Sequence, residues 1–178
     1  MYSNTPPGLP LVNPKGLRYD EGNALQARPN HIHLRNAEPI DEKFVWEVNN
    51  EATVRSVSLS TQPIPYHDHI RWFASKLGDD RAHLAIVEVN GERAGVLRLE
   101  QLDDCIEISL ALEPSFRGRG VGTVAIRHGC RLAGEKLGAH PLVARVLRVN
   151  AASIRAFEHA GFVCDVDKSA TVARLTYG

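Results

Sequence analysis

A glycine- and arginine-rich segment in the middle of the chain has the residue types that bind a phosphate. It follows an apolar run at 105–112 and precedes a helical pattern that opens at Thr123. A strand, a glycine loop and a helix N-terminus in this order point successive backbone N–H groups at a ligand, and the helix dipole favours negative charge. Glycines let the backbone approach the phosphate because no Cβ intervenes. The segment therefore predicts a pyrophosphate-binding loop made of Arg117, Gly118, Arg119, Gly120, Val121, Gly122 and Thr123.

Two common phosphate-binding motifs do not fit this loop. A nucleoside-triphosphate loop needs a lysine directly after its glycines, and none stands there. A dinucleotide fingerprint spaces its glycines as G-x-G-x-x-G in the first strand–helix turn. Here Gly118, Gly120 and Gly122 are evenly spaced, and three strand-like runs precede them. The pattern that remains is Arg117-x-x-Gly120-x-Gly122.

This pattern resembles the Q/R-x-x-G-x-G/A signature of the Gcn5-related N-acetyltransferases (GNAT), which hold the pyrophosphate of acetyl-coenzyme A. Downstream, Asn150-x-x-Ser153-x-x-x-Phe157-x-x-x-Gly161-Phe162 is similar to the N-x-x-[AS]-x-x-x-[YF]-x-x-x-GF block of the same superfamily. The resemblance covers residues 31–176. It implies an α/β (α+β) fold with a single mixed, largely antiparallel, splayed sheet flanked by helices, in the order β-α-α-β-β-β-α-β-α-β-β. It also implies an N-acetyltransferase that uses acetyl-coenzyme A and no metal.

Composition fits one domain without a membrane segment. The chain has 178 residues, of which 43% are hydrophobic and 24% are charged. No apolar stretch approaches the roughly 18 residues of a membrane helix, and the sequence does not start with a signal peptide. We therefore expect a cytoplasmic protein with no membrane partner. The cysteines show no metal spacing and fit reduced, buried thiols at Cys105, Cys130 and Cys164.

The formal net charge of zero hides a polarised distribution. Residues 113–155 carry 8 Lys/Arg against 2 Asp/Glu, whereas residues 1–112 carry 11 against 16. The basic block contains both motifs, and its arginines would steer an anionic cofactor. Nucleic acid is the rival ligand. We expect none, because aromatic residues do not interleave with the arginines.

The pattern along the chain predicts a leading arm and one domain. Residues 1–30 hold five of the ten prolines and show no period, which indicates an extended arm before an acetyltransferase domain at 31–178. Period-2 and apolar runs predict strands at 32–35, 83–89, 93–99, 105–112, 142–147, 162–166 and 171–177. Period-3.6 patterns predict helices at 41–50, 66–77, 123–137 and 151–160.

Several residues predict how these elements begin, end and pack. Asn90-Gly91 is typical of a tight hairpin turn. Asp41 and Asn150 are candidate N-caps, and Gly161 is a candidate helix stop. In the helix at 66–77 we expect one buried face made of Ile70, Phe73, Ala74 and Leu77. In the helix at 123–137 we expect a buried stripe made of Ile126, Cys130, Ala133 and Leu137.

Acyl transfer from a thioester to an amine needs a proton acceptor, because an amine with a pKa of about 10 is charged at neutral pH. Glu107, an acid within an apolar strand, is our candidate base, and relatives in the superfamily carry a Glu at the same offset. The alternative is a strand carboxylate that faces solvent or pairs with an arginine. The resemblance also implies thioester-binding N–H groups near Leu110, Ala111 and Leu112.

The second motif adds three candidates. Ser153 is a candidate acid for the leaving thiolate, or else an ordinary residue in the first turn of a helix. Asn150 is interpreted as a cap first and a cofactor contact second. Many family members carry a tyrosine at the position of Phe157. Because a phenyl ring cannot donate a proton, we expect Phe157 to pack, either in the core or against the pantetheine arm.

The Glu107 offset resembles that of ribosomal-protein and nucleotide-sugar acetyltransferases. The region before the hairpin resembles the first two helices of acetyltransferases that act on nucleotide-linked amino sugars, including the pseudaminic acid pathway, where this region walls the acceptor pocket. The resemblance implies acceptor contacts from Trp46, Arg55, His69 and Trp72. A metal at His67-x-His69 lacks a third ligand nearby. Three functions stay open: a transferase for an amino sugar or other small amine, a protein N-terminal or lysine acetyltransferase, and a weakly catalytic coenzyme A-binding module. Whether the protein forms a homodimer also stays open.

Overall fold

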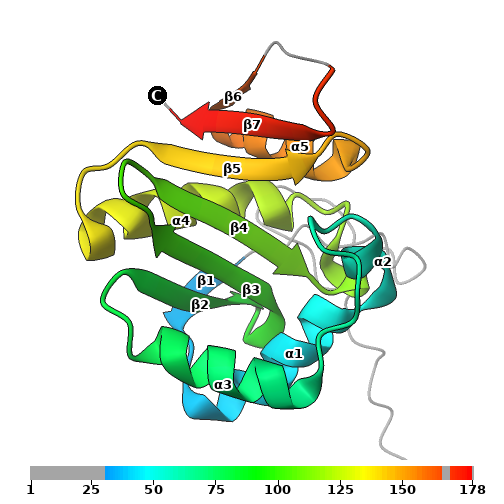
Figure 1. The fold of residues 1–178 in the computed structure, drawn as a ribbon, viewed down its shortest axis with the longest axis vertical. Helices are drawn as coiled ribbons and strands as arrows, with labels where there is room; N and C mark the ends of the chain where they lie inside the picture. Colours follow the sequence, from blue (N-terminus) through cyan, green and yellow to red (C-terminus); the bar gives the residue numbers. More distant parts are fainter. Residues whose placement is uncertain (1–30, 166–168, 178) are drawn as a thin grey trace, which may run out of the picture.

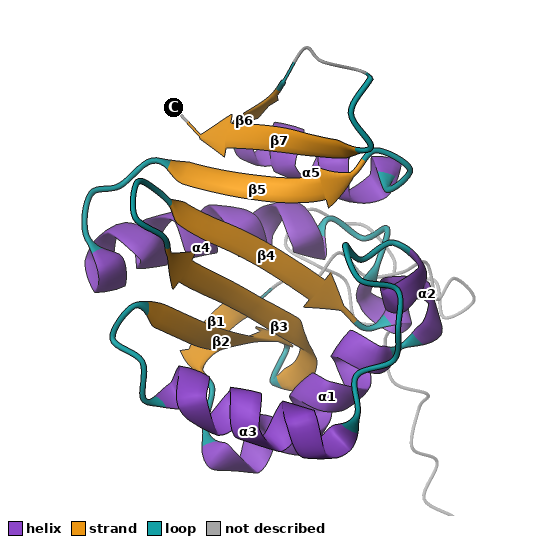
Figure 2. Ribbon diagram, viewed as in Figure 1, coloured by secondary structure: helices purple, strands orange, loops and turns teal. Residues whose placement is uncertain are grey.

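The described residues, 31–165 and 169–177 of the computed structural model, form a sheet of seven strands flanked by helices (Figures 1 and 2). The strand order is β1-β2-β3-β4-β5-β7-β6, and only the β4–β5 pair is parallel. The strands are β1 (Ile32–Asn36), β2 (Ala82–Val89), β3 (Glu92–Gln101), β4 (Ile106–Leu112), β5 (Leu142–Leu147), β6 (Phe162–Cys164) and β7 (Val172–Tyr177).

Helices lie on both faces of this sheet, as Figure 1 shows. They are α1 (Glu42–Asn50), α2 (Ala52–Ser56), α3 (Tyr66–Leu77), α4 (Val121–Leu137) and α5 (Ala151–Ala160). The order of strands and helices confirms the fold predicted from the resemblance. The short helix α2 was not predicted. It is one and a half turns long, which is too short for a 3.6-residue period to show in the sequence.

Two apolar clusters fill the two faces of the sheet. Val96 packs with Val45 and Phe73 under α1 and α3, whereas its neighbour Leu97 packs with Ile126 under α4. Successive residues of a strand point to opposite faces. Because both faces are covered, the middle strands are continuously apolar, and every residue of Ala85–Val87 is fully buried.

Strands β4 and β5 touch only at their first residues. Their pairing consists of Ile106 with Leu142 and Glu107 with Val143. Beyond these pairs the strands diverge, and in Figure 1 an opening separates the far ends of their ribbons. From Ile108 onward, no strand in the described part of the chain pairs with that edge of β4. The divergence is the splay that the resemblance implies.

Local turn and cap predictions are confirmed. Asn90 and Gly91 both have positive φ, 53° and 85°, as a two-residue hairpin turn requires. Asn150 Oδ1 accepts the N–H of Ser153 at 3.1 Å and caps α5. Gly161 ends α5 in the left-handed region with φ of 110°. These signals need only neighbouring residues, which is why the sequence reveals them.

Asp41 occupies the N-cap position of α1, as predicted, but its side chain does not cap the helix. Its carboxylate is fully buried and accepts two bonds from Arg35, at 2.6 and 2.8 Å. The Arg35 guanidinium holds the pKa of this carboxyl below its usual range. An arginine on β1, unrecognisable from the local sequence, therefore takes the carboxylate away from the helix end.

Of the predicted buried face of α3 only Phe73 is confirmed, and Ile70, Ala74 and Leu77 are exposed. Ile70 and Leu77 are 42% and 38% exposed, and the face turned to the sheet carries His69, Trp72 and Phe73. The predicted residues and the residues that are actually buried both have the spacing of one helix face. The 3.6-residue period alone therefore does not show which face is buried. The polar face can be buried because the Nε2–H of His69 donates to the carbonyl oxygen of Glu42 at 2.9 Å.

The remaining expectations concern buried thiols, strand ends and the arm. Cys105 is buried, and Cys130 and Cys164 are half-buried, all as free thiols. Strand β6 ends at Cys164, and the predicted end at residue 166 lies outside the described residues. The predicted arm at 1–30 also lies outside them. No helix in the described ranges has the length and apolarity that crossing a membrane requires.

Candidate active site

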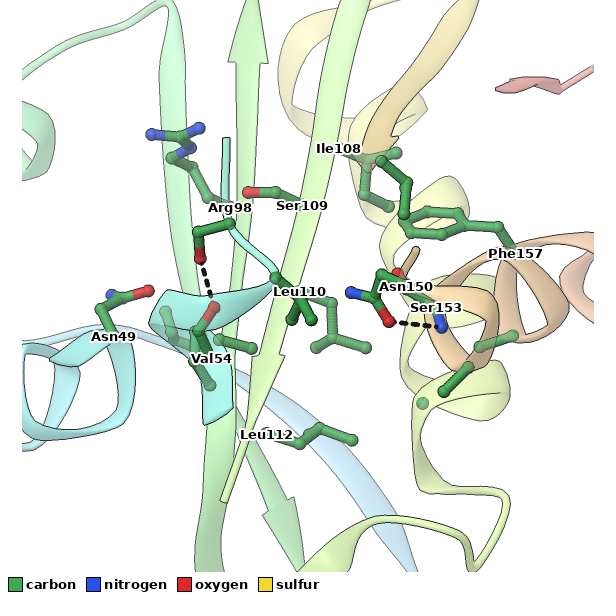
Figure 3. Close-up of a pocket in the computed structure, with 18 of the residues that line it drawn as sticks. Asn49, Val54, Arg98, Ile108, Ser109, Leu110, Leu112, Asn150, Ser153 and Phe157 are labelled. Atoms are coloured by element: carbon green, nitrogen blue, oxygen red, sulfur yellow. Dashed lines mark hydrogen bonds between the residues drawn. The ribbon is translucent and has the colours of Figure 1, made fainter. Parts of the chain in front are cut away.

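A cavity of about 1010 Å³ lies where β4 and β5 diverge. Its wall comes from α2 and the segment after it, from β4, from the glycine loop, and from the N-terminal half of α5. In the close-up of Figure 3, Asn49 and Val54 lie on one side of β4, and Asn150, Ser153 and Phe157 lie on the other. The strand therefore runs between two halves of the cavity, each built from different elements.

The glycine loop has the geometry of an anion site. Gly118 and Gly120 have φ of 70° and 80°, and Gly120 immediately precedes α4. No side chain caps this helix end, so the first-turn N–H groups, which have no intrahelical partner, are left for a ligand. A Cβ built on Gly118 or Gly120 would meet no atom within 4 Å. The space above the loop is open, and its donors fit a pyrophosphate.

The side chain of Arg117 is held by protein groups. Its Nε and Nη2 donate to the carbonyl oxygen of Leu112 at 2.8 and 2.6 Å. Nη2 also donates to Glu51 Oε2 at 2.9 Å, and Nη1 donates to Thr53 Oγ1. Within the loop, Arg119 Nη1 donates to the carbonyl oxygen of Ser115 at 3.3 Å. The loop backbone, rather than the Arg117 guanidinium, is therefore the part presented to a phosphate.

The end of β4 offers backbone groups to the cavity. Leu110, Ala111 and Leu112 all line it, on the stretch of β4 that β5 leaves unpaired. Figure 3 shows Leu110 between the two halves of the cavity. A strand edge without a partner presents N–H donors to whatever lies beside it. That is the position from which such donors would polarise a thioester carbonyl.

The first turn of α5 forms the other wall. Asn150 Oδ1 is engaged with the Ser153 N–H, the bond drawn in Figure 3, so Asn150 serves as a cap. Ser153 lines the cavity. Phe157 is 2% exposed and packs edge-to-face against Phe162 with ring centroids 5.0 Å apart. It also borders the cavity, so the packing interpretation of Phe157 fits its position.

Glu107 lies at the point where β4 and β5 part. Its residue is 8% exposed, and its carboxylate borders the cavity. Arg145 Nε donates to Oε2 at 2.7 Å, and Arg98 Nη2 lies 3.9 Å from Oε1. This is the arginine-paired arrangement that the sequence left open as an alternative. The ion pairs fix the carboxylate beside the cavity, and its role as a base stays a prediction.

The four predicted acceptor contacts separate into two pairs. Trp46 does not line the cavity; its indole N–H donates to the carbonyl oxygen of Ile64 at 2.9 Å, and its ring packs edge-to-face on Tyr66. His69 borders the cavity but is 1% exposed and bonded to α1. The indole N–H of Trp46 and the Nε2–H of His69 are thus both engaged in hydrogen bonds within the protein. Arg55 and Trp72 line the cavity with surface left for a ligand.

Sequence reasoning missed the partners of the site residues. Arg98 and Arg145 flank Glu107, and Glu51 binds Arg117. The usable signal was Glu107 itself, because a carboxylate within a buried apolar strand needs a cationic partner, whereas Arg145 is an exposed position of β5. Nothing near Glu51 in the sequence points to Arg117. In the described ranges, no cluster of three His, Cys, Asp or Glu side chains could hold a metal ion.

Comparison with known proteins identifies the family. A family model described as "Acetyltransferase (GNAT) domain" matches residues 31–163. The chain belongs to this family. It is 29% identical over 136 residues to YwnH of Bacillus subtilis (strain 168), a candidate phosphinothricin acetyltransferase, with 72% of this chain and 82% of YwnH covered. The family makes the chain an acetyltransferase by domain type.

Solved GNAT structures share the fold. The spermidine N-acetyltransferase from Vibrio cholerae, solved with coenzyme A and spermine, superposes with a TM-score of 0.71 at 19% identity, over 82% of this chain and 94% of that one. The aminoglycoside acetyltransferase AAC(6′)-Ib, solved with coenzyme A, gives a TM-score of 0.68 at 18% identity, also over 82% and 94%. At these identities the likeness concerns the fold. The finer resemblance to ribosomal-protein or pseudaminic acid enzymes stays a prediction.

Proposed function

We propose that this GNAT protein transfers an acetyl group from acetyl-coenzyme A to a primary amine of a small molecule. The observation that carries the proposal is one cavity that joins an open glycine loop, an unpaired strand edge and a fixed carboxylate. Coenzyme A or acetyl-coenzyme A is bound in several solved neighbours, which supports the choice of cosubstrate.

The residues that would hold the cosubstrate come from three elements. The loop N–H groups from Gly118 to Thr123 would bind the pyrophosphate at the start of α4. The open edge at Leu110–Leu112 would receive the pantetheine arm and the thioester carbonyl. Asn150 and Ser153 would lie beside the sulfur at the start of α5. Bound acetyl-coenzyme A would supply an activated acetyl thioester.

Because the amine is charged at neutral pH, transfer requires two protons to leave its nitrogen and the C–S bond of the thioester to break. The amine nitrogen attacks the thioester carbon, the C–S bond breaks, and the electron pair of that bond leaves with sulfur. N–H groups at the end of β4 would stabilise the developing oxyanion. Glu107, directly or through water, would accept the first proton from the ammonium before attack. The second proton leaves the nitrogen after attack and ends on the departing thiolate, to which Ser153 would donate a hydrogen bond. A thiol of pKa about 8.5 leaves readily, so the base matters more than the acid.

The acceptor is proposed to be a small molecule, with a nucleotide-linked amino sugar as the finer candidate. Arg55 supports this candidate because it is a cation on the acceptor side without a carboxylate partner in the described chain. Trp46 and His69 give it no support, since packing uses their polar atoms. The name of YwnH points to phosphinothricin, another amine with acidic groups. A protein N-terminal or lysine acetyltransferase is the alternative.

A thiol-release assay tests the proposal. Purified full-length protein is mixed with acetyl-coenzyme A and a panel of nucleotide amino sugars, amino acids, polyamines and peptides, and free coenzyme A is titrated. Release that depends on a small amine supports the function, and mass spectrometry locates the acetyl group on nitrogen. Release with peptides alone would favour a protein acetyltransferase. Coenzyme A binding with no release from any amine would favour a non-catalytic binding module.

A further inference from the structure

Arg55 lies at the end of α2 and borders the cavity. Its Nη1 donates to the carbonyl oxygen of Ser60 at 3.1 Å, and its Nη2 donates to Ser58 Oγ at 3.1 Å. Ser58 Oγ in turn donates to the carbonyl oxygen of Val54 at 2.6 Å. These contacts are all to neutral oxygens. They orient the guanidinium without neutralising its charge.

The charge of Arg55 has no counter-ion among residues 31–165 and 169–177. No carboxylate there lies within ion-pair distance of its guanidinium, and its Nε is buried without an acceptor. A guanidinium has five N–H groups, of which these contacts use two. Partial burial lowers the pKa of Arg55. Desolvation of a cation without a counter-ion is unfavourable, and an anion placed against the guanidinium would offset this cost.

The other charges around the cavity do not neutralise Arg55. Among the described residues its wall carries two carboxylates, Asp68 and Glu107, and each is already paired, with Arg71 at 2.6 Å and Arg145 at 2.7 Å. The same wall carries five arginines, namely Arg55, Arg98, Arg117, Arg145 and Arg155. Such a cavity repels an acceptor that brings several positive charges and attracts one that brings a negative charge.

The position of Arg55 separates its anion from the coenzyme's pyrophosphate. The glycine loop already supplies donors for the pyrophosphate, at the start of α4. Arg55 is instead bonded to Ser58 and Ser60, which follow α2 in the sequence and also line the cavity. In Figure 3, Val54 of the same helix lies across β4 from Asn150 and Ser153. An anion at Arg55 would therefore belong to the acceptor.

We infer that the amine acceptor carries an acidic group, a carboxylate or a phosphate, and that Arg55 binds this group; the inference rests on the proposed function. Arg55 would then be the residue that selects acidic amines over neutral or cationic ones. Polyamines and aminoglycosides, the acceptors in the names of two solved neighbours, lack such a group. We expect both to be poor acceptors here, although the fold is shared.

The test compares acceptors that differ in one acidic group. O-Phosphoethanolamine is paired with ethanolamine and β-alanine with β-alaninamide, and spermidine is added as a polycation. Binding of each to the coenzyme A complex is measured by calorimetry, and kcat/KM is measured by thiol release. For wild type, the acidic member of at least one pair should exceed its neutral partner at least about tenfold in both measurements, since one charge-assisted hydrogen bond accounts for that factor. Which pair shows the preference distinguishes phosphate from carboxylate.

Three variants make the assignment specific. Arg55→Met should remove the preference while leaving KM for acetyl-coenzyme A and binding of the neutral amine unchanged. Arg55→Lys, which keeps the positive charge, should retain part of the preference for the acidic acceptor. Arg131→Met, at an exposed position of α4 outside the cavity wall, is the matched control and should keep the wild-type preference. Thermal melts confirm that each variant is folded.

Each outcome decides one of the two proposals. Equal affinity for acidic and neutral amines, faster turnover of spermidine, or an Arg55→Met variant that weakens acetyl-coenzyme A alone would overturn the acidic-acceptor assignment. The comparison of acceptors within wild type keeps this decision independent of any folding defect. An Arg55-dependent binding preference without coenzyme A release would keep the anion site and overturn the transferase function instead.

Discussion

Arg117 and Glu51, 66 positions apart in the sequence, form an ion pair with Nη2 and Oε2 2.9 Å apart. The same guanidinium donates to the carbonyl oxygen of Leu112 at the end of β4. One side chain thus links the glycine loop, the open strand edge and the start of α2. The start of α2 is thereby tied to the loop that would bind the coenzyme, whereas Arg55 lies in the last turn of this helix.

Replacing Glu51 with Gln should lower the melting temperature in a pH-dependent way. Bonds from the Thr53 hydroxyl and Thr53 N–H, together with Arg117, lower the pKa of Glu51 from 4.5 to about 2. A carboxyl with a lowered folded pKa stabilises fully above its unfolded pKa and loses that contribution as the pH falls through the folded value. Melting curves from pH 7 to pH 2 measure the gap, which is the difference in melting temperature between wild type and variant.

That gap should be full above pH 4.5 and should narrow toward pH 2. Glu47→Gln is the control, because the Lys43–Glu47 pair is exposed (side chains 72% and 51%) and should contribute little. A Glu51→Gln gap that does not change with pH, or one no larger than that of the control, would show that Glu51 does not hold the loop and α2 together.

Replacing Gly120 with Asp should abolish the stabilisation by coenzyme A. Ligand at about a hundred times its Kd stabilises the folded protein by about 2.7 kcal/mol, which a thermal-shift assay detects. The new side chain would put a negative charge in the open space above the loop, where the phosphate is expected. Gly120→Ala shares the backbone strain at φ of 80° without the charge and should keep most of the shift. An undiminished shift for Gly120→Asp would place the coenzyme elsewhere.

Replacing Glu107 with Gln should reduce kcat about 10²-fold at neutral pH if Glu107 accepts the amine proton. The amide keeps the shape and a hydrogen-bond acceptor for Arg145 but cannot take a proton. The loss should shrink as the pH rises, because more of the amine is then deprotonated in solution. A pH–rate profile checks this. A loss that is the same at every pH would indicate a positioning role through the ion pair with Arg145.

Replacing Ser153 with Ala should cost clearly less than Glu107→Gln, because the thiolate leaves readily without an acid. The backbone N–H of Ser153, which Asn150 caps, is unaffected by the substitution. Steady-state kcat values for the two variants under one condition make the comparison. If Ser153→Ala proves the more damaging change, the roles assigned to these two residues are wrong.

Replacing Gly95 with Ala should destabilise the sheet at the cavity. A Cβ at this position of β3 would lie 2.2 Å from the carbonyl oxygen of Ala111 and 3.0 Å from the Cα of Leu112. Because both are backbone atoms, β3 and β4 must separate, at a cost of about 1–3 kcal/mol. Urea unfolding measures the loss, and weaker coenzyme A binding should accompany it.

The matched control for Gly95→Ala is Gly134→Ala. Gly134 lies inside α4, and a Cβ there would meet no atom within 4 Å. Alanine in a helix interior should stabilise the protein by about 0.5–1 kcal/mol. We therefore expect the free energy of unfolding to fall for Gly95→Ala and to rise for Gly134→Ala. A neutral Gly95→Ala would mean that the β3–β4 backbones do not approach as closely as the structure has them.

The sequence by itself determined the features that depend on neighbouring residues. The loop from Arg117 to Gly122, the Asn90-Gly91 turn and the cap at Asn150 each depend on residue type and short spacing. Backbone conformation and helix capping act over a few residues, so their signals are local. Together with the resemblance they were sufficient for the family and for the order of strands and helices along the chain, apart from α2.

Only the tertiary structure decided which side chains meet. The buried face of α3 and the pairing of Glu107 with Arg145 join elements far apart in the chain. Arg35 and Asp41 are close in sequence, but their pairing depends on how β1 and the start of α1 are placed against each other. The same holds for Arg55, which is available to a ligand because packing brings no carboxylate to it from any described element. An ion pair depends on distance and burial, and these are fixed only when the sheet and its helices pack.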